Sequence, residues 1–100
     1  MTELTNEPHR RSQARFPLGR IMITATAREK LNNLDVLNAL GRHVRGDWGD
    51  VDDEDWEANE RALVEGTRLL SVYHTAEGVK FYIITEWNRS MSTLLLPEDY

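Results

Sequence analysis

The sequence contains no cysteine, and this absence excludes several kinds of site. Without thiols there are no disulfides, no thiol nucleophile and no cysteine-based zinc site. No apolar run approaches the roughly 20 residues that cross a bilayer. Residues 1–15 also lack the apolar stretch of a secretory signal. We therefore expect a cytoplasmic protein without a membrane partner.

Basic residues are in the minority, with 12 Lys and Arg against 17 Asp and Glu, so the net charge is −5. An acidic chain repels phosphate backbones, and we expect no direct nucleic-acid binding. A protein partner with a basic surface is favoured instead. The alternative, in which acidity serves solubility alone, stays open here, as does the oligomeric state.

A chain of 100 residues with 40% hydrophobic residues accommodates one small domain. Residues 1–16 are polar, contain Pro8 and show neither helical nor strand periodicity, which predicts a disordered polar tail. Residues 17–100 are then expected to form a single α+β domain.

Turn and capping residues divide this domain into elements. We predict a strand over 20–24, a short helix over 27–31 capped by Thr24 or Thr26, and a helix that Asp35 caps. Leu37, Leu40 and Val44 would form the apolar stripe of that helix, and Gly46 or Gly49 would end it. A further helix is predicted over about 53–65, with Asp50 or Asp52 as its N-cap and Gly66 closing it.

Alternating patterns predict strands over 69–74, 79–86 and 91–96, with a hairpin turn at 75–78. The order is therefore β-α-α-β-β-β, with the additional helix before the second strand. We expect one antiparallel sheet with the helices packed on one face. Trp48 lies at the joint between two predicted helices, and Trp56 lies on the apolar stripe of the helix over about 53–65. Both are predicted to be mostly buried.

Residues 42–57 hold the densest group of functional side chains. His43, Asp47 and Asp50 form the one cluster that resembles a general base or a metal-binding group, but their spacing matches no metal signature. We expect His43 to lie instead on the exposed side of a helix end. No catalytic residue, metal or cofactor is assigned.

The acids of this stretch have two interpretations: they cap a helix, or they present carboxylates to a basic groove as a duplex backbone would. The predicted interaction surface comprises Asp47, Asp50, Asp53, Glu54, Asp55 and Glu57. Secondary candidates are His43, Arg45 as an anion ligand, and Glu86 and Arg89 as a pair across a turn.

Several segments together resemble short bacterial proteins of plasmids and mobile elements. They are residues 43–50, 55–56, 58–59, 68–73, 83–86, 89–90 and 94–100. Such proteins commonly carry the labels "plasmid-related protein" or "type I restriction endonuclease subunit M", and the resemblance covers about residues 18–100. No glycine-rich cofactor loop follows a predicted strand, so we expect no methyltransferase domain. The resemblance implies a mobile-element or defence context.

The order of elements is also similar to that of the RelE/ParE-like toxins, which are usually basic. We therefore expect a non-enzymatic, small acidic interaction protein, a modulator of a nucleic-acid-handling partner. The alternative is a RelE/ParE-like small ribonuclease toxin that uses His43 or His74 with Arg68 and Arg89.

Overall fold

The computed structural model describes residues 13–100, which form a four-stranded sheet with three α-helices. The elements in order are β1 (Arg20–Ile23), α2 (Ala25–Lys30), α3 (Asn33–Val44), α4 (Asp53–Glu65), β2 (Leu69–His74), β3 (Lys80–Thr85), β4 (Met91–Leu95) and the 3-10 helix η1 (Pro97–Asp99). The α+β class and the predicted order of elements are confirmed. Within the described part of the chain, no helix combines the length and apolar character needed to cross a membrane.

Side chains fix the starts of all three helices. Thr24, Asn32 and Asp52 each accept a hydrogen bond from the backbone N–H three residues later, at 3.2, 2.8 and 2.8 Å. Asp35, the predicted cap of α3, lies instead in its first turn, because Asn32 already fills the capping position. Gly66, with a φ of 74°, ends α4 in the left-handed conformation, as predicted.

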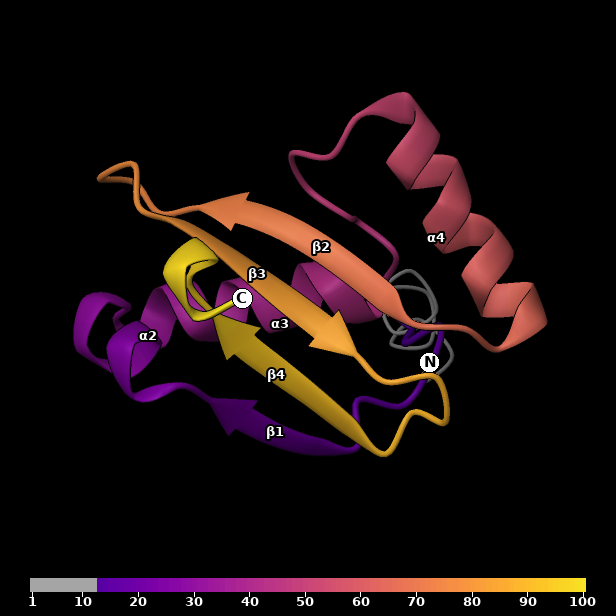
Figure 1. Ribbon diagram of the computed structural model, residues 1–100, viewed down its shortest axis with the longest axis horizontal. Helices are drawn as coiled ribbons and strands as arrows, with labels where there is room; N and C mark the ends of the chain where they lie inside the picture. The colour runs from indigo at the N-terminus through magenta and orange to yellow at the C-terminus, as the bar shows by residue number, and fades with distance from the viewer. Residues whose placement is uncertain (1–12) are drawn as a thin grey trace, which may run out of the picture.

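The sheet has the strand order β1-β4-β3-β2 and is not wholly antiparallel (Figure 1). Two hairpins join β2, β3 and β4, whose pairs are antiparallel. The first strand, β1, joins the free side of β4 in a parallel pair. The prediction of an antiparallel sheet is therefore wrong for β1, because the period of a strand gives its faces but not the direction of its neighbour.

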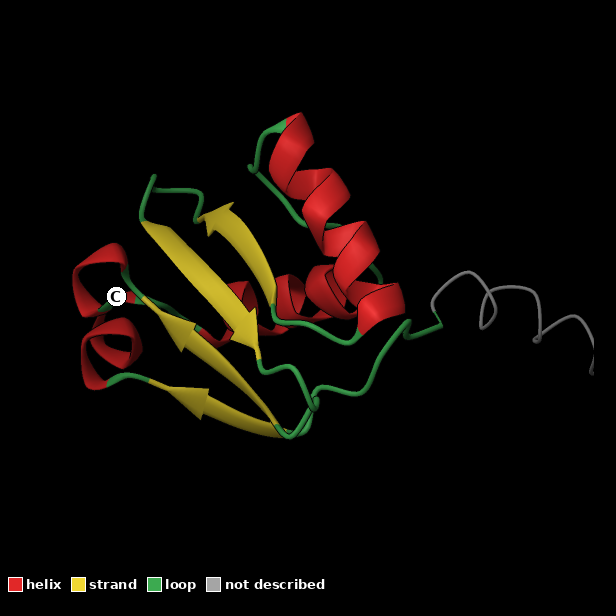
Figure 2. Cartoon of the chain, turned by 45° about the vertical axis from the view of Figure 1, so that its right-hand side comes forward, coloured by secondary structure: helices red, strands yellow, loops and turns green. Residues whose placement is uncertain are grey.

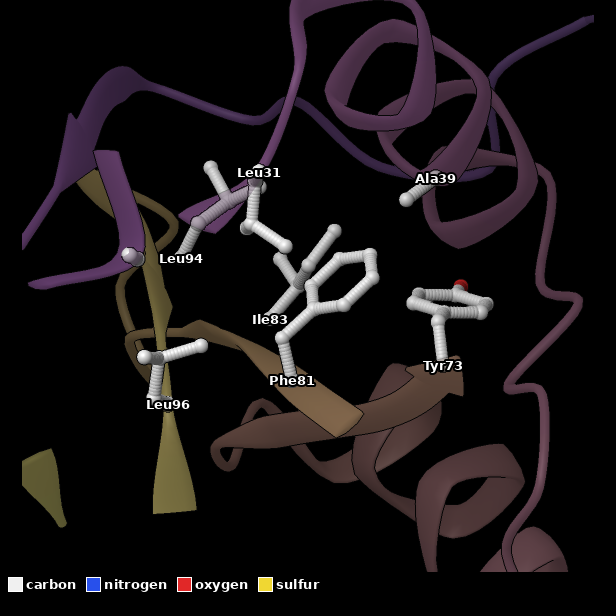
Figure 3. Packing of buried hydrophobic residues seen from close by; sticks show 8 residues of the cluster. Leu31, Ala39, Tyr73, Phe81, Ile83, Leu94 and Leu96 are labelled. Atoms are coloured by element: carbon white, nitrogen blue, oxygen red, sulfur yellow. The ribbon is translucent and has the colours of Figure 1, made fainter. Parts of the chain in front are cut away.

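The main core lies between one face of the sheet and the helices α2 and α3. Figure 1 shows α3 behind the strands and α2 at the left, beyond the ends of β1 and β4. Val36 and Leu40 pack against this core from α3, whereas the predicted stripe residue Leu37 is 66% exposed. The stripe is therefore rotated from the predicted one. The buried side chains of the core, seven of which Figure 3 labels, are Ala27, Leu31, Ala39, Tyr73, Phe81, Ile83, Leu94 and Leu96.

A second cluster surrounds Trp48, which is fully buried with Phe16, Ala62 and Leu69. The indole Nε1 donates a hydrogen bond to Glu60 at 2.9 Å, so the polar edge of the ring is satisfied. The prediction for Trp48 is confirmed. Trp56 is 36% exposed and its predicted burial is wrong, because α4 turns only one flank to the sheet.

The outer edge of β2 is closed by two kinds of partner. The Val72 N–H donates to the Trp48 carbonyl at 3.1 Å, and the Asp50 N–H donates to the Val72 carbonyl at 2.7 Å. The Asn59 amide bonds both backbone groups of Leu70, at 2.8 and 3.1 Å. The helix α4 therefore lies beside β2 rather than with α2 and α3 on one face, as Figures 1 and 2 show.

The predicted tail ends earlier than residue 16. The Arg15 N–H donates to the Val44 carbonyl at 2.8 Å, and its guanidinium pairs with Glu60 at 2.9 Å. Phe16 is buried, and its ring stacks on Trp48 with 6.1 Å between centroids. Arg15 and Phe16 therefore belong to the folded domain, and the prediction for residues 1–12 lies outside the described residues.

Changing Trp48 to alanine should lower the free energy of unfolding by about 3–5 kcal/mol, because a cavity replaces a fully buried ring. The change Trp56→Ala should cost about 1 kcal/mol, since that ring already contacts water. Urea melts followed by far-UV circular dichroism measure both values. Equal losses in the two variants would contradict the anchoring role of Trp48.

Changing Phe16 to alanine should cost about 3 kcal/mol of unfolding free energy, because the ring fills the Trp48 cluster. The neighbouring change Arg15→Ala serves as its control and should cost only about 0–1 kcal/mol, since the ion pair with Glu60 is solvent-exposed. Thermal melts of the two variants make the comparison. An unchanged melting temperature in Phe16→Ala would mean that the folded domain begins at residue 17, as the sequence predicted.

Candidate functional site

A groove of about 440 Å³ lies where the start of α4 meets the face of the sheet that α2 and α3 leave uncovered. Val72 and Tyr82 are paired across β2 and β3, so they point to the same face, and Leu70 shares it by the two-residue period. We call this cavity the α4 groove. Its lining residues are Asp50, Val51, Asp52, Asp55, Leu70, Val72, Lys80, Tyr82 and Tyr100.

One wall of the α4 groove is acidic. Asp50 is exposed and bonds the His74 Nδ1 at 2.7 Å. Asp52 caps α4, and Asp55 follows in its first turn. The partial positive charge at the start of α4 attracts the carboxylates of Asp52 and Asp55. The wall therefore offers several carboxylate acceptors at one end of the groove.

The floor of the groove is formed by aliphatic and aromatic side chains, with Lys80 beside them. The rings of Tyr82 and Tyr100 meet edge to face, with 5.8 Å between centroids. Arg68 donates to the Tyr100 hydroxyl at 3.0 Å and so holds the last residue over the sheet. The Lys80 ammonium lies 5.8 Å from the Tyr82 ring centre. The floor therefore presents ring faces and edges beside the carboxylates.

The predicted acidic surface is only partly brought together. Asp50 and Asp55 line the groove, whereas Asp53, Glu54 and Glu57 are exposed elsewhere on the first turns of α4. Asp47 does not line the groove and pairs with the Arg42 guanidinium at 2.7 Å, which holds the pKa of the Asp47 carboxyl below its usual range. The groove also uses Asp52, Tyr82 and Tyr100, which sequence reasoning did not select.

His43 is buried in the core, so its predicted exposure is wrong. Its Nδ1 lies 2.6 Å from the Ser71 hydroxyl and its Nε2 lies 2.8 Å from the Thr85 hydroxyl. The Ser92 hydroxyl donates to the Leu18 carbonyl at 2.7 Å, so it must accept from Thr85. Thr85 then accepts from Nε2–H, and Nδ1 accepts from Ser71. The ring is thus a neutral, structural link between α3 and the sheet.

Arg89 is also structural. Its guanidinium donates to the carbonyls of Ala62 and Thr67, at 3.0 and 2.6 Å, and so satisfies carbonyl groups at the end of α4. The contact with Glu86 joins the guanidinium to the backbone carbonyl at 3.1 Å, not to the carboxylate that was predicted. Arg45 is exposed and lines a separate cavity of about 410 Å³ beside Arg42.

The residues of the ribonuclease alternative do not converge. His43 has no exposed surface from which to act on a substrate. His74 ends β2, whereas Arg68 precedes the start of the same strand and Arg89 lies in the turn after β3. Because β2 and β3 are antiparallel, His74 and the two arginines lie at opposite ends of the sheet.

Comparison of the chain with models of known families, with curated proteins and with solved structures gives no significant match. The described residues themselves therefore have to indicate the function.

Burial of His43 makes stability depend on pH. Burial, together with the positive charge of Arg89, lowers the pKa of His43 from 6.5 to about 4. The unfolded chain therefore binds this proton more readily, and the folded state loses stability as the pH falls below 6.5 toward 4. The loss should reach about 3 kcal/mol near the lower value.

The variant His43→Gln should lack this pH-dependent component, whereas His74→Gln, at an exposed position, should keep it. Urea melts of the three proteins at several pH values between neutral and acid provide the measurement. If the pH dependence of the unfolding free energy were the same in His43→Gln as in the wild type, other titratable groups would be its cause.

Proposed function

We propose that this chain is a small, cytoplasmic, non-enzymatic interaction protein that binds a basic segment of a partner protein in the α4 groove. The observation that supports this proposal is the combination of an acidic wall, with Asp50, Asp52 and Asp55, and an aromatic floor. Either feature alone would be ordinary on an acidic protein. Together they match the two parts of a lysine or arginine side chain.

A basic side chain has an apolar stem and a charged head. The stem can pack on Val72 and Tyr82 while the head meets the carboxylates of Asp50 and Asp55. Hydrogen bonds between an ionised donor and an ionised acceptor are stronger than neutral ones. A volume of about 440 Å³ accommodates a short segment rather than a folded domain. The geometry thus favours a loop or tail of the partner.

The acids outside the groove have a supporting role in this proposal. Asp53, Glu54 and Glu57 are exposed around the same helix and add to the negative field near the groove. Such a field raises the association rate with a basic partner. A nucleic-acid-handling protein is a suitable partner, because the surface that binds the phosphate backbone is itself basic. The chain would then act as a modulator of that surface.

Short peptides selected on the immobilised full-length chain, from a displayed library of random sequences, should be enriched in Lys and Arg next to aliphatic or aromatic residues. The double variant Asp50→Asn, Asp55→Asn should weaken binding of a selected peptide by about tenfold, mainly through faster dissociation. Fluorescence anisotropy and surface plasmon resonance give the affinity and the rates.

The matched control is Asp53→Asn, Glu54→Gln, which removes the same charge from the same end of α4 but outside the groove. Its affinity at physiological salt should fall by less than about threefold, since exposed charges are screened over about 8 Å. Selected peptides without basic residues, or equal losses in the two double variants, would overturn the proposal.

A further inference from the structure

The outer edge of β1 is open among the described residues. The N–H groups of Arg20 and Thr24 donate to carbonyls on the side of β4, at 3.0 and 3.1 Å. Because alternate residues of a strand point their backbone groups to opposite sides, those of Ile21 and Ile23 point away from β4. Figures 1 and 2 show β1 at the free edge of the sheet. This edge can therefore pair with another strand.

The centre of β1 lacks the residues that usually prevent the pairing of an edge strand. Proline and charged side chains serve this purpose in many sheets. The centre of β1 instead holds Ile21 and Met22, which are 45% and 40% exposed. At the opposite edge of the sheet, Asn59 and residues 48–50 bond the backbone of β2. The exposed apolar edge at β1 is therefore the one that can receive another strand.

The backbone of β1 is complementary to that of a second copy of the chain. A two-fold axis through Met22 sets two β1 strands antiparallel, with Ile21 of each copy opposite Ile23 of the other. Both residues point their backbone groups outward, so each of these pairs exchanges two hydrogen bonds. A shift by one residue would set outward-pointing groups against inward-pointing ones, and a shift by two would pair Ile21 or Ile23 with a residue outside β1. The edge therefore favours one register.

The two ends of β1 differ in charge on the face that α2 and α3 leave uncovered. Ile23 packs against the main core, so Arg20 and Thr24 point to the uncovered face by the two-residue period. There the Asp99 carboxylate accepts hydrogen bonds from the hydroxyls of Thr24 and Thr26, at 2.6 and 2.5 Å. Within residues 13–100, Arg20 enters no ion pair. One end of β1 therefore presents a guanidinium and the other end a carboxylate.

The antiparallel register brings these opposite charges together. Arg20 of each copy lies opposite Thr24 of the other, at the end where Asp99 holds its carboxylate. The two Arg20 residues themselves lie about 13 Å apart along the strands, where their repulsion is screened at physiological salt. The acids of α4 lie at the far edge of each sheet, beside β2. The contact therefore forms two ion pairs without setting the arginines against each other.

The apolar side chains of β1 fit the same register. Met22 of each copy meets its equivalent at the axis, on the uncovered face. On the other face, Ile21 of each copy lies beside Ile23 of the other, next to a groove of about 190 Å³. Ile21 and Ile23 line this groove together with Leu31, Leu94 and other residues. Its size suits an aliphatic side chain, so Ile21 of each copy can enter the groove of the other.

We propose that two copies of this chain associate through their β1 strands, in the register centred on Met22, and so join two four-stranded sheets into one of eight strands. Backbone hydrogen bonds, the ion pairs of Arg20 with Asp99 and the burial of Met22 and Ile21 stabilise the dimer. The paired strands are short, so the interface is small and the dissociation constant lies in the micromolar range. The α4 grooves stay open at the outer edges, so this proposal does not depend on their function.

Sedimentation equilibrium of the full-length chain, over about a hundredfold range of concentration, should show a passage from monomer to dimer. Met22→Lys should weaken dimerisation at least about tenfold, because two like charges then lie opposite each other at the axis. Its control, Val64→Lys, adds the same charge at a position on α4 that is 87% exposed, and should change the dissociation constant by less than about twofold. A wild type that is monomeric at every concentration, or equal effects of the two variants, would overturn the proposal.

The charge complementarity has its own test in the same experiment. Arg20→Gln should weaken dimerisation about fivefold, because both ion pairs of the interface are lost. The control Arg61→Gln removes the same charge from an exposed position on α4 and should have less than about a twofold effect. Tighter dimerisation of Arg20→Gln than of the wild type would mean that the arginines repel each other, which contradicts the register.

The register can be tested by cross-linking, because the chain has no cysteine of its own. In Met22→Cys the two Cα atoms would lie about 4.5 Å apart, within the range of a disulfide, so mild oxidation should give a covalent dimer. Arg20→Cys, with its two sites about 13 Å apart, should cross-link far less. Equal cross-linking of both variants would contradict the register. Protection of the Ile21 and Ile23 amides from hydrogen exchange in a monomeric chain would show that another segment occupies the edge, and would overturn the proposal.

Discussion

The pairing of Val72 with residues 48–50 is the interaction on which the second core cluster and the α4 groove both depend. Two backbone hydrogen bonds attach this segment to the edge of β2. The attachment requires glycine at position 49, because its φ is 79° and a Cβ there would overlap the Val72 carbonyl oxygen. On one side of Gly49 the chain sends Trp48 into the second core cluster. On the other side it places Asp50 at the α4 groove.

This attachment also explains the asymmetry of the sheet. The segment 48–50 and Asn59 use the backbone groups along the β2 edge, so α4 starts close to the sheet. Asp52 and Asp55 therefore line the groove. At the other edge, β1 is short and has no such cover among the described residues. The acidic side chains therefore gather at the closed edge, whereas Arg20 and Arg28 flank the open one.

Local signals in the sequence predict the ends of α4 and the strands well, and non-local contacts explain the errors. Asp52 and Gly66 act within one turn, so the bounds of α4 follow from the sequence. The parallel neighbour of β1 depends on a strand some seventy residues later, which no local pattern specifies. For the same reason the burial of His43 was missed: its partners Ser71 and Thr85 are supplied by the sheet. The acids of the groove were recognisable, but its floor required the pairing of Val72 with Tyr82.

The distribution of acids at the start of α4 separates the two interpretations of that stretch. Helix capping accounts for Asp52, and the helix dipole accounts for Asp53, Glu54 and Asp55 in the first turn. Neither effect accounts for Asp50, which lies two residues before the cap and has no contact with the helix backbone. Its carboxylate is instead exposed at the groove beside His74. Asp50 is therefore the acid on which the proposed binding role depends most. Its backbone pairing with Val72 fixes its position independently of α4.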